Sequence, residues 1–131
     1  MTGQRFLRDT RGVTAVEFAL TAPAFLLLLF GIAQVAMGLW ASYALQHGAE
    51  AAARCATITP TKCGTIAAIQ QFAVDQSYAF NVPRSAFTVD MSATCGDRPG
   101  NQVTASMPQF EFLTKAKLGT YTVRAAACFP K

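Results

Sequence analysis

The sequence predicts an α+β protein in which a long apolar helix near the N-terminus continues into a small domain with a second helix and a three-stranded antiparallel sheet. Two observations carry this prediction. Residues 18–40 contain no charged side chain over a length that spans a bilayer. Residues 87–94 alternate between apolar and polar side chains, and Val103, Ala105 and Met107 alternate again with polar residues, which is typical of half-buried strands.

The composition fits one domain together with a membrane segment. The 131 residues are 52% hydrophobic and 14% charged, a length for one domain and short for two. The net charge is +4, but the basic residues are scattered and form no basic stripe. We therefore expect no nucleic-acid partner.

The long helix is expected over residues 13–54, with residues 13–40 in the membrane and residues 41–131 outside it. Past Trp40 the sequence stays compatible with a helix that has one apolar and one polar face. These faces hold Leu45, Ala49 and Ala52 on one side and Gln46, Glu50 and Arg54 on the other. Glu50 and Arg54 have the i,i+4 spacing of an ion pair.

The charges that flank the apolar segment predict its orientation. Arg5, Arg8 and Arg11 precede it against a single Asp9, whereas residues 41–50 contain no Lys or Arg. The positive-inside rule then places the N-terminus in the cytoplasm and the rest of the chain on the other side of the membrane.

The four cysteines, Cys55, Cys63, Cys95 and Cys128, all follow the apolar segment. There is no C-x-x-C pair, and the single histidine, His47, lies eight residues from Cys55, so a zinc site is disfavoured. Two disulfides in an oxidising compartment fit this placement, with reduced cytosolic cysteines as the alternative. Of three connectivities, we prefer Cys55 with Cys63 and Cys95 with Cys128, because each bond would join neighbouring elements.

The second helix and the strands follow a break at Thr59-Pro60-Thr61. Helical spacing of Ile66, Ile69, Ala73 and Phe80 predicts a helix over 63–79. Alternation then predicts a strand over 87–94, a turn over 97–101, a strand ending before Pro108, a loop at 115–119 and a third strand from Tyr121. The sheet is expected to pack on the outer half of the long helix.

The preferred pairing of Cys95 with Cys128 meets a conflict of strand parity. Cys95 shares the parity of the apolar positions in its strand, whereas Cys128 shares that of Thr122 and Arg124. A bulge near Ala126, or a strand that ends before Cys128, would remove the conflict.

The apolar segment has three interpretations. A cleaved secretory signal could end at Ser42-Tyr43-Ala44, but it would be unusually long. An ordinary anchor explains the length and the flanks but leaves Glu17, a carboxylate at the edge of an apolar helix, without a reason. The third interpretation comes from the residues around Glu17.

Residues 12–34 read GVTAVEFALTAPAFLLLLFGIAQ: a glycine, four residues, Glu-Phe, Ala-Leu, a proline and a Leu-rich run. This pattern resembles prepilins, and more narrowly the TadE-like pseudopilins of Tad (Flp-type) pilus systems, over about residues 11–54. The resemblance implies a pilin-like fold, a leader at residues 1–12, and cleavage between Gly12 and Val13 by a prepilin peptidase. It also implies other pilins, the inner-membrane assembly platform and membrane lipid as partners.

Elementary chemistry agrees with these roles. Gly12 lets a protease approach the backbone closely. Cleavage would free the amine of Val13, which lies one helical turn from Glu17, on its own chain or on a neighbouring subunit. An ammonium–carboxylate pair between apolar helices would fix their register. Phe18 belongs to the same motif, and Pro23 removes one backbone donor and should loosen the helix locally.

We therefore expect a structural subunit that takes part in pilus assembly or priming, in the bacterial inner membrane with its C-terminal domain in the periplasm and, after assembly, in an extracellular pilus. No phosphate-binding loop, nucleophile motif or paired carboxylates indicate an enzyme or a cofactor. The alternative is a membrane-anchored periplasmic domain that binds a ligand or a protein.

Overall fold

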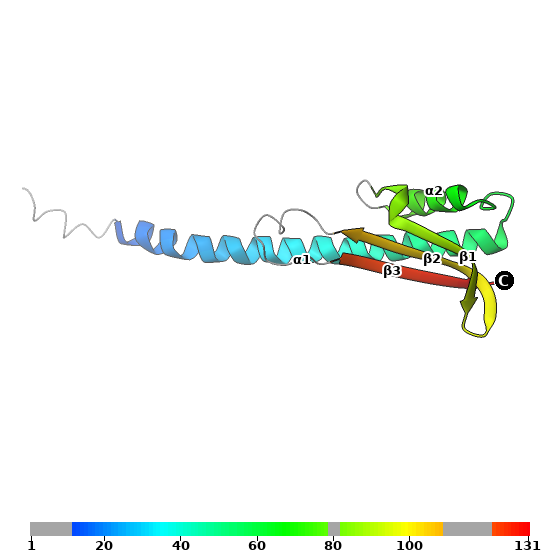
Figure 1. Ribbon diagram of the computed structural model, residues 1–131. Helices are drawn as coiled ribbons and strands as arrows, with labels where there is room; N and C mark the ends of the chain where they lie inside the picture. The colour runs from blue at the N-terminus through cyan, green and yellow to red at the C-terminus, as the bar shows by residue number, and fades with distance from the viewer. Residues whose placement is uncertain (1–11, 79–81, 109–121) are drawn as a thin grey trace, which may run out of the picture. The chain divides into compact units, whose positions relative to one another are not determined.

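The computed structural model describes residues 12–78, 82–108 and 122–131. The chain divides into two compact units, residues 1–37 and 38–131. Helix α1 (Val13–Ile58) contributes to both units, and the C-terminal unit adds helix α2 (Ile66–Gln76), a 3₁₀ turn η3 (Arg84–Ala86) and strands β1 (Phe87–Cys95), β2 (Arg98–Pro108) and β3 (Thr122–Pro130) (Figure 1). The expected α+β fold is confirmed.

Helix α1 is continuous over 46 residues and ends four residues later than expected. Thr59 donates its amide to the carbonyl of Cys55 over 2.9 Å, which closes the last helical turn. Pro60 then ends the helix, because a proline has no amide hydrogen and disfavours helical geometry in the residue before it.

Helix α2 is shorter than the expected 63–79 at both ends. Its N-cap is Thr65, whose hydroxyl oxygen accepts a hydrogen bond from the amide of Ala68 over 3.2 Å, so the helix cannot start at residue 63. At the other end, the hydroxyl and the amide of Ser77 both donate to the carbonyl of Val74. Phe80, expected on this helix, lies outside the described residues.

The three strands form one antiparallel sheet in the order β1-β2-β3, as the alternation predicts. Residues 98–101, expected in a turn, belong to β2, because the two-residue turn at Gly96 and Asp97 comes earlier. Gly96 has a φ of +66°, a backbone conformation that favours glycine and suits tight hairpins. The expected loop at 115–119 and Tyr121 lie outside the described residues.

The core of the C-terminal unit joins both helices to one face of the sheet. Its largest apolar side chains, Leu45, Ile69, Phe87 and Val103, are completely buried. Alanines fill most of the remaining core, which lets the elements approach closely. At Gly48 helix α1 approaches α2 so closely that a side chain there would lie 2.7 Å from the carbonyl oxygen of Ala73.

Candidate functional site

The start of α1 carries the residues that the sequence singles out for processing. Gly12 lies directly before Val13, the first helical residue, and a side chain built on Gly12 would meet no atom within 4 Å. Nothing in the described part of the chain therefore requires a glycine here, either by space or by a positive φ.

Glu17 and Phe18 lie one helical turn after Val13, and both are exposed. The Phe18 side chain is 72% accessible, and no cation pairs with the Glu17 carboxylate within the described residues. The hydroxyl of Thr21 donates to the backbone carbonyl of Glu17 over 3.0 Å. These side chains are therefore available for contacts with other molecules.

Pro23 lies inside α1, and the helix continues through it. The residues that follow are apolar around the whole circumference of the helix, and an 18-residue window reaches a mean hydropathy of 2.1 with none of its residues buried. By length and composition this is one helix that could cross a membrane. Its large apolar side chains are exposed, with Leu20 and Leu27 each 75% accessible.

All four cysteines form disulfides in the expected pairing, Cys55 with Cys63 and Cys95 with Cys128. The first bond joins α1 to the turn before α2, and the second joins β1 to β3. Both bonds lie in the C-terminal unit. No group of three or more His, Cys, Asp or Glu side chains suited to a metal occurs among the residues that the structure describes.

The parity conflict at the second disulfide is resolved by a bulge, but not where it was expected. Strand β3 runs in regular register through Ala126 and beyond Cys128, so neither proposed repair occurs. Instead the register of β1 shifts between Asp90 and Ala93, where one extra residue turns Cys95 to the other face of the sheet. Asp90 stabilises the bulge by accepting hydrogen bonds from the amide and the hydroxyl of Ser92.

Gly100 explains how this disulfide crosses the middle strand. Any side chain on Gly100 would collide with the sulfur of Cys95 and with the backbone of Phe129. The bond from β1 to β3 thus passes over β2 at a residue without a side chain. Figure 1 shows the backbone of this region, where the β1–β2 hairpin lies next to the C-terminal end of β3.

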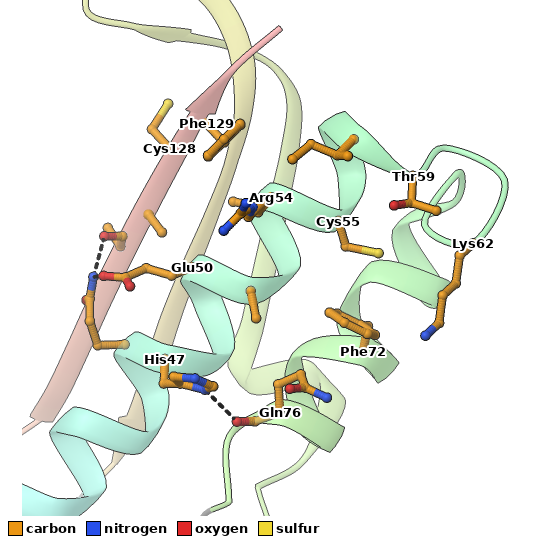
Figure 2. A pocket seen from close by; sticks show the side chains of 16 residues that line it. His47, Glu50, Arg54, Cys55, Thr59, Lys62, Phe72, Gln76, Cys128 and Phe129 are labelled. Carbon is orange, nitrogen blue, oxygen red and sulfur yellow. Dashed lines mark hydrogen bonds between the residues drawn. The ribbon is translucent and has the colours of Figure 1, made fainter.

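An open groove of about 900 Å³ lies over the outward face of α1 in the C-terminal unit. Residues 126–129 of β3 line one side, and Lys62, Phe72 and Gln76 line the other (Figure 2). Lys62 lies over the ring of Phe72, with its nitrogen 4.8 Å from the ring centre. The sequence analysis did not identify this groove, because its sides come from segments far apart in the chain.

Glu50 and Arg54 both line the groove but do not form the ion pair that their spacing allows. The Glu50 carboxylate instead accepts a hydrogen bond of 2.7 Å from the side-chain amide of Gln46. The same amide also reaches the carbonyl of Ala126, at 3.4 Å. Gln46 thus connects α1 to β3, and it binds the Glu50 carboxylate in place of Arg54.

His47 connects the two helices. Its Nδ1 lies 3.0 Å from the backbone oxygen of Gln76, the last residue of α2, and caps the C-terminal end of that helix (Figure 2). In the sequence His47 stood alone. Its partner is a backbone atom 29 residues away, which no pattern of residue types could reveal.

Comparison with known proteins gives one match. Residues 12–54 match a family model described as TadE-like protein. No curated protein and no solved structure matches the chain. The matched segment begins at the glycine before α1, includes Glu17 and Pro23, and ends at Arg54 in the groove. Over this segment, about a third of its length, the chain is similar to TadE-like proteins.

Proposed function

We propose that this chain is a minor pilin, or pseudopilin, that takes part in assembling or priming a Tad (Flp-type) pilus. The match to the family supports a pilus-associated structural role, and the apolar first half of α1 supports membrane anchoring. The observation that carries the proposal is the arrangement at the start of this helix: a glycine, a helix that begins at the next residue, and an exposed carboxylate one turn later.

The first step in this proposal is cleavage between Gly12 and Val13 by a prepilin peptidase. The support is that Gly12 has no structural reason to be glycine in the described chain. The glycine would then serve an external partner, such as a protease that must approach the backbone at the scissile bond closely. Residues 1–12 would be the leader and Val13 the new N-terminus.

The second step is register between subunits. Cleavage would leave an ammonium group on Val13 and a carboxylate on Glu17, at the exposed end of an apolar helix. Two such helices, packed side by side in lipid, can pair the ammonium of one with the carboxylate of the other. This pair would neutralise two charges that are costly to leave alone in the membrane.

The topology in this proposal is a single pass through the bacterial inner membrane. Residues 1–12 face the cytoplasm, residues 13–40 span the membrane and residues 41–131 form the periplasmic domain, which an assembled pilus would carry outside the cell. The partners are the peptidase, other pilins, the assembly platform and lipid. The two disulfides support an oxidising compartment for the domain.

N-terminal sequencing and intact-mass measurement of the protein purified from membranes test the cleavage. We expect the chain to start at Val13 when the peptidase is present and to keep its leader when the peptidase is absent. Gly12→Val should keep the leader in both cases, whereas Gly31→Val, a matched change inside the helix, should be cut normally. A start at Met1 in the presence of the peptidase, or a start near residue 45, contradicts the proposal.

The variant Glu17→Gln tests the register. We expect it to be cut normally and to reach the membrane but to be lost from sheared pili and from crosslinked complexes with other pilins. Glu50→Gln, which changes the other glutamate of α1, is the control and should assemble like the wild type. Normal incorporation of Glu17→Gln would remove the register role.

The groove favours one alternative function, a membrane-anchored domain that binds a ligand or protein in the periplasm. The face of α1 between β3 and α2 is open and carries both charged and apolar side chains. An Arg54→Glu/Phe72→Ala variant separates the two functions. Pilus assembly should persist in this variant if the chain acts through its apolar helix, and should fail if the groove holds the essential partner.

A further inference from the structure

Three aromatic residues are exposed at one end of the C-terminal unit. Trp40 and Tyr43 are one turn apart on α1, and Tyr78 follows the C-terminal end of α2. We call these three residues the aromatic edge. Their side chains are 47%, 70% and 71% accessible, respectively, so none of them belongs to the core.

The ring of His47 lies between those of Tyr43 and Tyr78. Its ring centre lies 6.4 Å from that of Tyr43 and 5.7 Å from that of Tyr78. Because His47 also binds the carbonyl of Gln76, the end of α2 is tied to α1 at this level. The close helix crossing at Gly48, one residue further on, fixes the same arrangement.

The backbone of Tyr78 turns the chain away from α2 at the aromatic edge. Its φ is +45°, the only positive φ of a non-glycine residue among the described parts of the chain. A residue with a large side chain rarely adopts this conformation. This conformation directly follows the C-cap Ser77, where it ends α2, and it leaves the ring of Tyr78 largely accessible.

The position of the aromatic edge along the chain indicates what it contacts. The exposed apolar run of α1 continues through Val35 and Leu39 and ends at Trp40. Residues 38–48 contain no Asp, Glu, Lys or Arg. The acid of α2, Asp75, binds the side-chain amide of Gln71 on its own helix, over 2.8 Å. Trp and Tyr are the residues enriched where a transmembrane helix leaves the bilayer.

We propose that the aromatic edge lies in the headgroup region of the membrane, so that Tyr78 anchors the end of α2 to lipid. The apolar rings would enter the upper acyl region while the indole and phenol groups stay hydrated. The proposal rests on membrane anchoring by α1. It adds that the domain itself is held on the bilayer at a second point, which the helix alone does not require.

Tryptophan fluorescence of the full chain tests this contact, because Trp40 is the single tryptophan. The chain is placed in phosphatidylethanolamine–phosphatidylglycerol vesicles that carry a nitroxide quencher near the headgroup. Two further proteins are compared, Trp40→Phe/Tyr78→Trp and the control Trp40→Phe/Ile66→Trp. Ile66 is also exposed, at 51%, but begins α2 at its opposite end. Circular dichroism checks that each variant is folded.

We expect quenching at position 78 to be about twofold or more above that at position 66, together with a blue-shifted emission. Equal quenching at the two positions overturns the inference. So does shielding of position 78 from both the lipid quencher and aqueous iodide, which would mean that a protein covers the aromatic edge. If Trp40 in the wild type escapes the lipid quencher as well, membrane anchoring itself has failed, and the two failures are thus distinguished.

Discussion

The two halves of helix α1 differ in the burial of their apolar side chains. Before residue 38 its large apolar side chains, such as Leu27, are exposed. In the C-terminal unit, by contrast, Leu45 is completely buried in the core that the helix forms with the sheet and α2. The same secondary structure therefore serves two environments. The 52% hydrophobic content does not measure one core, because much of it belongs to side chains that are exposed along the first half of α1.

The C-terminal unit has an alanine-rich core, so its disulfides should contribute much of its stability. Replacing Cys95 and Cys128 by Ala should lower the free energy of unfolding by about 3.7 kcal/mol, from the entropy of the loop that the bond closes. The matched pair Cys55→Ala/Cys63→Ala closes a shorter loop and should cost about 2.5 kcal/mol. Urea unfolding in detergent measures the loss of unfolding free energy for both double variants. A larger loss for Cys55→Ala/Cys63→Ala would show that loop length does not determine these losses.

Two leucines test whether the halves of α1 differ in burial, because Leu45 is buried and Leu27 is exposed. Leu45→Ala should lower the free energy of unfolding of the C-terminal unit by about 3 kcal/mol, because it opens a cavity in a packed core. Leu27→Ala removes the same atoms from the exposed region and should leave this unfolding unchanged. Equal effects of the two variants on the urea midpoint would break the distinction between the regions.

Two glycines of α1 allow a smaller contrast. Gly48→Ala places a methyl group against the carbonyl of Ala73 and should cost about 1–3 kcal/mol, since backbone must move. Gly38→Ala meets no atom within 4 Å and should stabilise the helix by up to about 1 kcal/mol. In thermal unfolding followed by circular dichroism, the midpoint temperature should fall for Gly48→Ala and rise for Gly38→Ala. A shift in the same direction for both variants would refute the close helix crossing.

The smallest expected effect concerns acid pH and the bulge of β1. Hydrogen bonds from the amide of Ser92 and then from its hydroxyl hold the pKa of Asp90 below its ordinary value of 3.8. A depressed folded-state pKa contributes stability above the ordinary value, and this contribution disappears as the pH falls through the depressed one. Between about pH 5 and pH 3, the wild type should therefore lose more stability than Asp90→Asn. Parallel pH curves would mean that the bulge does not depend on the charge.

Much of this fold follows from local pattern, and the departures have specific causes. Residues 13–54 and the strand alternation were readable because apolar periodicity reflects burial on one face. The helix extends to Ile58 because Pro60 sets its end, and α2 is short because Thr65 and Ser77 cap it. The bulge at Asp90 was missed because its determinant is a hydrogen bond from a residue two positions away, which alternation does not register.

The candidate sites divide in the same way. The motif around Gly12 and Glu17 lies within one stretch of sequence, so it could be recognised without a structure. The groove and the capping role of His47 depend on partners brought together by the tertiary fold, such as Gln76 and Phe129. Residue types alone gave no indication of these contacts.

The bond that passes over Gly100 has a consequence for how the chain responds to proteases. Cys95 and Cys128 close a covalent ring that contains the whole of β2 and most of β3. A single backbone cut anywhere between these two cysteines leaves the two fragments linked. Such a molecule keeps its size on a non-reducing gel and separates only after reduction, so damage inside the ring does not by itself remove the domain from its helix.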